Sequence, residues 1–277
     1  MSKKSESSLI VTINANISSN LFVAYTSLEH LRLNENLSPS GLLSVRTIEL
    51  CHKRMNLMSN LLDFVATKDS VPASMNTDCF DCTQLFSAVR DAFRQTVSEY
   101  STLSTDFFSK LDHSYSVQIN KMAFETIVLS LLYCCVKSFE DTGTNKGKII
   151  FSISETKDSV VFHIRTNIIS PDSELIERLL TSHKHHKTDI YSPEAVLALT
   201  LEVASEFMRR AKGKLAFTTL KSGNRYDIYL PKITSAPKNV LLSPTHYFPT
   251  MESYEGFFAE FKLAHIAKKQ NQELTPQ

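Results

Sequence analysis

Cys79 and Cys82 stand at a spacing that can bind zinc or exchange a disulfide. A structural zinc site needs two further ligands, and no second Cys/Cys or Cys/His pair stands at ligand spacing. The other thiols are Cys51, Cys134 and Cys135, and an odd total of five in 277 residues is not typical of a disulfide framework. The alternative interpretation is that Cys79 and Cys82 are small buried side chains. We predict no metal site.

The histidines are densest in the segment HKHHK at residues 183–187. Three imidazoles so close together could hold a metal or an anion, and the alternative is a polar, solvated loop. No Ser/His/Asp or Cys/His catalytic set can be derived from spacing alone. The sequence therefore predicts no catalytic residue on its own.

The composition is that of an ordinary globular protein, with 42% hydrophobic and 21% charged residues. The formal net charge of +1 gives no global field that would attract nucleic acid or an anionic membrane. The first apolar run is interrupted by Asn14, Asn16 and Asn20, too early for a signal sequence or a membrane span. We expect a cytoplasmic protein.

Two long amphipathic helices are predicted at the N-terminus. Apolar residues recur every three or four positions over residues 9–33, and a second such series runs from Val45 to Val65. Ser38 and Pro39, which lie between the two series, are typical of an N-cap followed by a proline in the first turn. Two helices with a short loop form an antiparallel hairpin, which needs a second copy to bury both apolar faces in a four-helix bundle. The predicted interface of this homodimer comprises Ile13, Ile17, Leu21, Leu28, Met55, Met58 and Leu62.

An α/β pattern follows a polar connector. Helical patterns over 82–97, 121–140 and 193–211 alternate with strand patterns at 105–111, 116–120, 147–156, 158–167 and 214–231. This order predicts an α+β fold with helices layered on one face of a mixed sheet. We divide the chain into a dimerisation hairpin (1–72), an α/β sandwich (73–233) and a tail (234–277) that includes a possible docking helix.

This order of elements resembles the core of a bacterial sensor histidine kinase over residues 8–232. The resemblance rests on four segments in the right order: RMNLMSNLLDFVATKD, FDCTQLFSAVRDAF, SLLYCCVKSF and VASEFMRRAKGKLAFTTLKSGNRYDIYLP. It implies a dimerisation hairpin followed by an ATP-binding domain of the gyrase/Hsp90/kinase type.

The resemblance also implies that the nucleotide site is degenerate. Cys134 stands where the family has the asparagine that binds magnesium, and a thiol is a poor ligand for this hard cation. Thr166 stands where the family has an aspartate that accepts a hydrogen bond from the adenine amino group. The remaining positions of this site are Lys137 at the family's lysine and Ile168, Ala198 and Thr200 at family glycines.

The distribution of glycine supports the same interpretation without a residue-by-residue alignment. The chain has six glycines, and none lies between Gly147 and Gly213, where a nucleotide loop would stand. A phosphate cradle made of backbone N–H groups depends on such residues. We expect ATP and magnesium binding to be lost, so no cofactor is predicted.

The hairpin has lost its reactive group as well. Ala15 stands at the position of the family's phosphoacceptor histidine, and ANISSNL replaces HELRTPL. By the family's geometry, the upper hairpin is the face that docks a receiver domain or a kinase. The predicted partner-binding residues are Ala15, Asn16, Ser18, Ser19 and Phe22.

The leading hypothesis is therefore an inactive histidine-kinase-like adaptor that binds a response regulator or a partner kinase. The alternative is a histidine phosphotransferase that relays phosphate through His30 or His52 of the hairpin. A residual ATP-binding module and an unrelated α+β structural protein are two further interpretations.

Overall fold

The computed structural model describes residue 17 and residues 21–33, 36–67, 77–144, 146–181, 195–233 and 246–273. They belong to two compact units, one made of Met1–Val71 with Thr250–Gln277 and the other of Pro72–Pro249. The predicted tail, 234–277, is thus divided between the units at Thr250.

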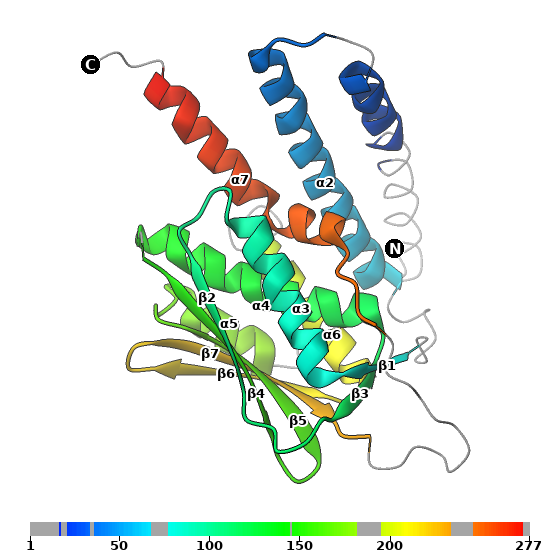
Figure 1. Ribbon diagram of the computed structural model, residues 1–277, viewed down its shortest axis with the longest axis vertical. Coiled ribbons are helices and arrows are strands. Elements are labelled where there is room, and N and C mark those ends of the chain that lie inside the picture. Colours follow the sequence, from blue (N-terminus) through cyan, green and yellow to red (C-terminus); the bar gives the residue numbers. More distant parts are fainter. Residues whose placement is uncertain are drawn as a thin grey trace, which may run out of the picture. The chain divides into compact units, whose positions relative to one another are not determined.

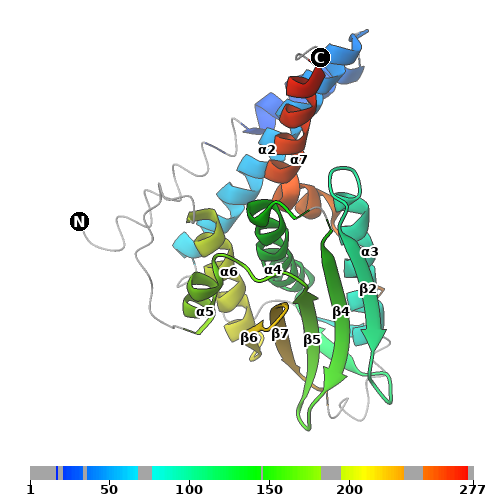
Figure 2. The same ribbon diagram turned by 90° about the vertical axis from the view of Figure 1, so that its left-hand side faces the viewer.

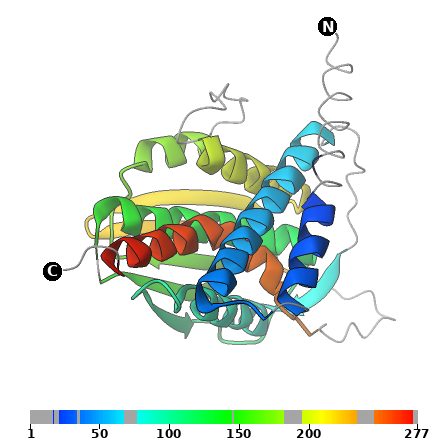
Figure 3. The same cartoon turned by 90° about the horizontal axis from the view of Figure 1, so that it is seen from above.

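The first unit consists of helices. Residues 21–33 are helical, α2 spans Pro39–Thr67 and α7 spans Met251–Glu273. The amide of Gly41 donates to the hydroxyl oxygen of Ser38 at 3.1 Å, which confirms the predicted N-cap before Pro39. Helix α2 lies between the helical residues 21–33 and α7 (Figures 1 and 3). The C-terminal helix α7 therefore packs on the second helix of the hairpin.

The second unit contains a five-stranded mixed sheet in the order β2-β4-β5-β7-β6. The strands are β2 (Ser104–Ser109), β4 (Lys148–Glu155), β5 (Ser159–Thr166), β6 (Lys214–Leu220) and β7 (Gly223–Pro231). Only the β2–β4 pair is parallel in this sheet. A separate antiparallel pair joins β1 (Asp78–Asp81) to β3 (Ser116–Ile119). These strands agree with the α+β prediction.

Helices cover one face of the sheet (Figure 2). They are α3 (Cys82–Val97), α4 (Lys121–Thr142), α5 (Ser173–Thr181) and α6 (Ala195–Arg210). Of these, α3, α4 and α6 were predicted from periodicity, and α5 was not. The core between α3 and the sheet is aromatic, since the ring of Phe86 lies 5.2 Å from Phe151 and 5.0 Å from Phe162.

Helix α4 is the central helix of this unit. Among the described residues it alone is long and apolar enough to cross a membrane, and 83% of its most apolar window is buried. Asn120 caps its N-terminus by accepting from the amide of Ala123 at 3.0 Å. Its apolar character thus matches its burial in the protein core.

Candidate functional site

The predicted degenerate nucleotide site begins at Cys134 on α4. This side chain is 1% exposed, and its thiol donates to the carbonyl oxygen of Ser130 at 3.2 Å. Burial, with a smaller contribution from the carboxylate of Asp172, raises the pKa of Cys134 well above its usual range. The group is therefore a neutral thiol, which cannot replace an amide oxygen as a magnesium ligand.

Lys137 lies one turn further along α4 and is held by two carboxylates. Its ammonium is 2.5 Å from Asp141 and 3.1 Å from Asp172. Burial lowers the pKa of Lys137, but the hydrogen bonds to the two carboxylates outweigh it and raise the pKa. The positive charge is thus compensated within the protein, and the ion pair with Asp172 links α4 to the residue before α5.

Thr166, at the end of β5, donates one hydrogen bond and accepts another through its hydroxyl. Its hydroxyl donates to the carbonyl oxygen of Ile168 at 2.7 Å and accepts from the amide of Asn224 at 3.2 Å. The side chain is 2% exposed, and Ile168 is half-buried. The hydroxyl therefore has both a donor and an acceptor partner inside the protein.

The loop between β5 and α5 is closed by Ser170. Its carbonyl oxygen accepts from the amide and the hydroxyl of Ser173 at 3.2 and 2.6 Å. The side chain of Asn224 is oriented so that its amide oxygen accepts from the backbone N–H of Ser170 at 2.7 Å. These contacts connect the loop to the start of β7 and to the first turn of α5.

Ala198 and Thr200 lie in the first turns of α6 and are buried. The hydroxyl of Thr200 donates to the carbonyl oxygen of Leu197 at 3.0 Å. The positions aligned with the family's second glycine motif are therefore helical here. The HKHHK segment lies outside the described residues.

The predicted hairpin residues fall into three groups. Ile13, Ala15, Asn16, Ser18 and Ser19 lie outside the described residues. Leu21 and Leu28 are buried and Met58 is half-buried, whereas the exposed members are Ile17, Met55, Leu62 and the docking residue Phe22. The apolar positions of the hairpin thus divide between the inside of the unit and its surface.

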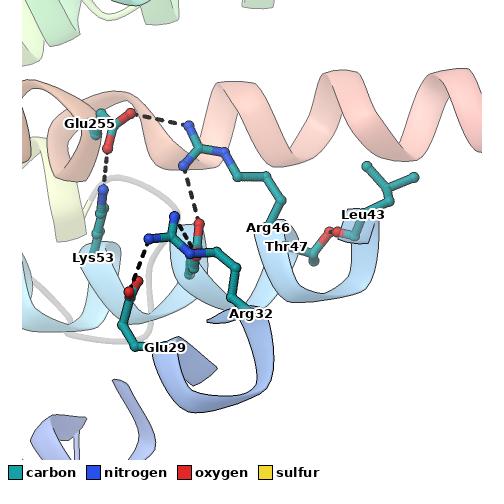
Figure 4. Close-up of polar contacts among 8 residues, drawn as sticks. Glu29, Arg32, Leu43, Arg46, Thr47, Lys53 and Glu255 are labelled. Atoms are coloured by element: carbon teal, nitrogen blue, oxygen red, sulfur yellow. Dashed lines mark hydrogen bonds and ion pairs between the residues drawn. The ribbon is translucent and has the colours of Figure 1, made fainter. Parts of the chain in front are cut away.

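A charge cluster joins the three helices of the first unit (Figure 4). It consists of Glu29, Arg32, Arg46, Glu49, Lys53 and Glu255. Arg46 on α2 reaches Glu255 of α7 at 3.1 Å, and Lys53 pairs with the other oxygen of the same carboxylate. Burial opposes ionisation of Glu255, but the hydrogen bonds from Lys53 and Arg46 lower its pKa.

The two candidate phosphate-carrying histidines differ in accessibility. His52 is 8% exposed, and its ring stacks on Tyr25 with centroids 5.0 Å apart. His30 is exposed on the helical segment 21–33. Of the two, His30 is the one that an incoming protein can reach in this arrangement.

Cys79 and Cys82 are free, buried thiols on β1 and at the start of α3. Burial, and next the charge of Asp81, raise the pKa of Cys82 to about 12. Within the described ranges, no group of three His, Cys, Asp or Glu side chains could hold a metal ion. The neutral state of Cys82 fits the interpretation as a small buried side chain.

One polar constellation was missed at the sequence level. Ser154 on β4, His163 on β5 and Asp227 on β7 form a continuous hydrogen-bonded chain. Because successive side chains of a strand point to opposite faces of the sheet, the sequence could have assigned each of these residues to a face. The pairing of β5 with β7, which brings in Asp227 from 64 residues away, carries no local signal.

The architecture of the chain is similar to that of solved histidine kinase structures. ShkA full-length in complex with AMPPNP aligns over 83% of this chain and 46% of its own, with 15% identity and a TM-score of 0.62. The fold is histidine-kinase-like. The chain thus spans less than half the length of ShkA.

The structures of two further histidine kinases, ThkA and AdeS, also align with the chain. The catalytic domain of histidine kinase ThkA aligns over 57% of this chain and 98% of its own, with 14% identity and a TM-score of 0.45. Acinetobacter baumannii histidine kinase AdeS aligns over 80% and 94%, with 13% identity and a TM-score of 0.48. No protein-family model matches the chain, and no curated protein matches it in sequence.

Proposed function

We propose that this chain is a histidine-kinase-like adaptor of two-component signalling that has lost the kinase reaction. It binds the receiver domain of a response regulator, or a partner kinase, and acts without phosphate transfer. The observation that carries the proposal is the internal pairing of Lys137 with Asp141 and Asp172. A lysine held in this way is a structural element of the domain and has its charge already compensated.

The other positions of the degenerate site support the same conclusion. Cys134 offers a neutral, buried thiol where magnesium needs an oxygen ligand. Thr166 uses its hydroxyl for Ile168 and Asn224, and a neutral hydroxyl cannot give the charge-assisted bond of a carboxylate. We infer that the chain binds neither ATP nor magnesium.

The partner surface that we propose lies on the first helix of the hairpin. Phe22 is 70% exposed and Val23 is 61% exposed, and large apolar side chains at such exposure are typical of protein-binding surfaces when they are grouped. We propose that Ala15, Asn16, Ser18 and Ser19 complete this surface. In this proposal the protein is a cytoplasmic homodimer that binds neither nucleic acid nor membrane.

The test is a binding titration of the purified chain against purified receiver domains and kinases encoded in the source genome. We expect one or a few of them to bind, and Phe22→Arg to weaken that binding at least tenfold. Met122→Arg changes a comparably exposed apolar residue of the other unit and serves as the matched control. Binding that ignores Phe22→Arg, or no binding to any receiver or kinase, would overturn the adaptor proposal.

Loss of nucleotide binding has its own test. Titration with magnesium-ATP up to millimolar concentrations should give no saturable signal by calorimetry. Saturable binding at micromolar concentrations would show that the closed contacts at Lys137 and Thr166 open for a nucleotide. That result would favour the residual ATP-binding module.

The alternative function, a histidine phosphotransferase, is favoured by one observation, the exposure of His30. A phosphorylated receiver would then transfer its phosphoryl group to an imidazole nitrogen of this chain. Acid-labile label that disappears in His30→Ala, or in His52→Ala, would establish the relay and refute inactivity. Under the adaptor proposal the chain stays unlabelled.

A further inference from the structure

A hydroxyl, an imidazole and a carboxylate lie in line on the sheet of the second unit. The hydroxyl oxygen of Ser154 is 2.7 Å from Nε2 of His163, and Nδ1 of His163 is 2.6 Å from Oδ1 of Asp227. The sheet register explains this arrangement. Asp227 is the direct cross-strand partner of His163, and Ser154 lies two residues beyond Ser152, the partner of His163 on β4.

The three side chains lie on the face of the sheet away from the helices. Phe151 and Phe162 pack against Phe86 of α3 and therefore face the helices. Ser154 and His163 are an odd number of residues from them on the same strands, so they face the opposite side. The degenerate nucleotide site is built on other residues, so this is a separate group.

The contact with Asp227 fixes one proton of His163. A carboxylate only accepts, so Nδ1 of His163 carries the hydrogen that is donated to Asp227. When the ring is neutral, Nε2 has a lone pair and can accept from the hydroxyl of Ser154. In that state the base is hydrogen-bonded to the proton that a nucleophilic serine must lose.

The carboxylate at the end of the chain is secured by its surroundings. Asp227 is 2% exposed, and the second carboxylate oxygen lies 3.0 Å from Nε of Arg225. A buried, paired carboxylate holds the imidazole in one tautomer and stabilises the imidazolium that forms when the ring takes a proton. The outer end is more open, since Ser154 and His163 are only partly buried.

One exposed apolar side chain lies on the same face of the sheet as the serine. Phe108 on β2 is the register partner of Ser152, which shares its face with Ser154, and Phe108 is 52% exposed. An aryl group can stack on such a ring. The backbone amides of a strand inside the sheet are hydrogen-bonded to the neighbouring strands, so they are not available to stabilise an oxyanion. A substrate with a good leaving group therefore suits this site best.

We propose that Ser154 is a nucleophile, activated by His163 and Asp227, that reacts with small aryl esters. The oxygen of Ser154 attacks the ester carbonyl carbon while its proton passes to Nε2 of His163. The bond to the leaving group then breaks, and the departing aryl oxygen takes that proton. Water, deprotonated by His163, next releases the acid and restores the hydroxyl, so that ester and water become acid and phenol.

The test uses a fluorophosphonate probe on the full chain. The serine oxygen forms a bond to phosphorus, fluoride leaves, and the proton is taken up by His163, which yields a stable phosphonyl ester. We expect peptide mass spectrometry to place the label on Ser154 and Ser154→Ala to abolish it. Loss of general-base assistance should slow labelling about 10²- to 10⁴-fold in His163→Gln.

Three controls separate chemistry from folding. His163→Gln keeps a donor for Asp227 but has no basic nitrogen. Asp227→Asn keeps the shape, removes the charge and should also slow labelling. Ser152→Ala alters the neighbouring serine on the same face and should label as the wild type does. Folding of each variant is checked by circular dichroism. No label on the wild type, or labelling of Ser154 that is unchanged in His163→Gln, would overturn the proposal.

Discussion

The ammonium of Lys137 lies 3.1 Å from the carboxylate of Asp172, so a side chain of α4 holds the residue that precedes α5. Asp141, one turn along α4, shares the same ammonium at 2.5 Å. Without Lys137, Asp141 and Asp172 would both lose this cationic partner. The pair therefore stabilises the position of α5.

Replacing Lys137 by methionine should loosen α5. The change keeps most of the unbranched apolar stem and removes the charge. Loss of a partly exposed ion pair costs about 1 kcal/mol. Hydrogen exchange of the amides of residues 173–181 should accelerate roughly fivefold. Lys148→Met removes an ion pair to Asp106 on the sheet and should leave those amides unchanged. Equal exchange in both variants would show that Lys137 does not hold α5.

The turn between β6 and β7 gives a second prediction. Gly223 has a φ of +134°, and a Cβ there would lie 1.9 Å from the carbonyl oxygen of Thr166. Since the obstacle is backbone, Gly223→Ala must displace the end of β5 and should cost about 3 kcal/mol or more of unfolding free energy.

The matched control for this change is Gly143→Ala. Gly143 also has a positive φ, +62°, but nothing lies within 4 Å of the added Cβ. Only the backbone strain of about 1 kcal/mol applies there. Urea unfolding followed by tyrosine fluorescence should rank the two variants in this order, and equal losses would contradict the close contact at Thr166.

The sequence was sufficient for the elements whose periodicity is strong. The predicted helix over 82–97 coincides with α3, and the hairpin over 214–231 corresponds to β6 and β7. Helix α5 was missed because it is only nine residues long, and its two fully or nearly buried members, Ile176 and Leu180, are too few to establish a period.

The candidate sites were predictable to different degrees. The prediction at Cys134 needed the residue type alone, because a thiol is a poor ligand for magnesium. The contacts of the predicted site residues, such as that of Lys137 with Asp172, depend on tertiary structure and have no signal in the chain. The same holds for Asp227, which strand pairing alone brings to His163.

Acid should release α7 from α2 through Glu255. Because Lys53 and Arg46 lower the pKa of Glu255 in the folded state, its contribution to stability is complete above the unfolded pKa of about 4.3. It is lost as the pH falls from there through the lowered folded value. Protease sensitivity of α7 should therefore rise over this acidic range, and Glu255→Gln should show raised sensitivity already at pH 7.

Glu252→Gln is the control for this experiment. Glu252 is an exposed residue of the same helix and should keep the pH response of the wild type. The variant at 255 should lose the part of the response that titrates between the two pKa values. An unchanged pH profile in Glu255→Gln would mean that other acids govern the docking of α7.

The homodimer is the remaining prediction from the hairpin. Ile48, Met55 and Leu62 recur every seven residues on α2, and their exposed fractions are 48%, 50% and 44%. A seven-residue apolar repeat on one helix face is the pattern of a helix–helix interface. These side chains are already about half buried, so burial of the remainder in a second copy would contribute about 1 kcal/mol each.

Light scattering on the eluted protein should therefore give a mass of twice 31.3 kDa, and Met55→Lys should shift it to the single mass. A lysine at the centre of the repeat would have to bury a charge in the interface, which costs more than the contact contributes. Met122→Lys introduces the same charge at an exposed methionine of the other unit and should leave the dimer intact. A wild-type chain that stays monomeric at about 100 μM would refute the dimer, and the exposed repeat would then be free for a different protein.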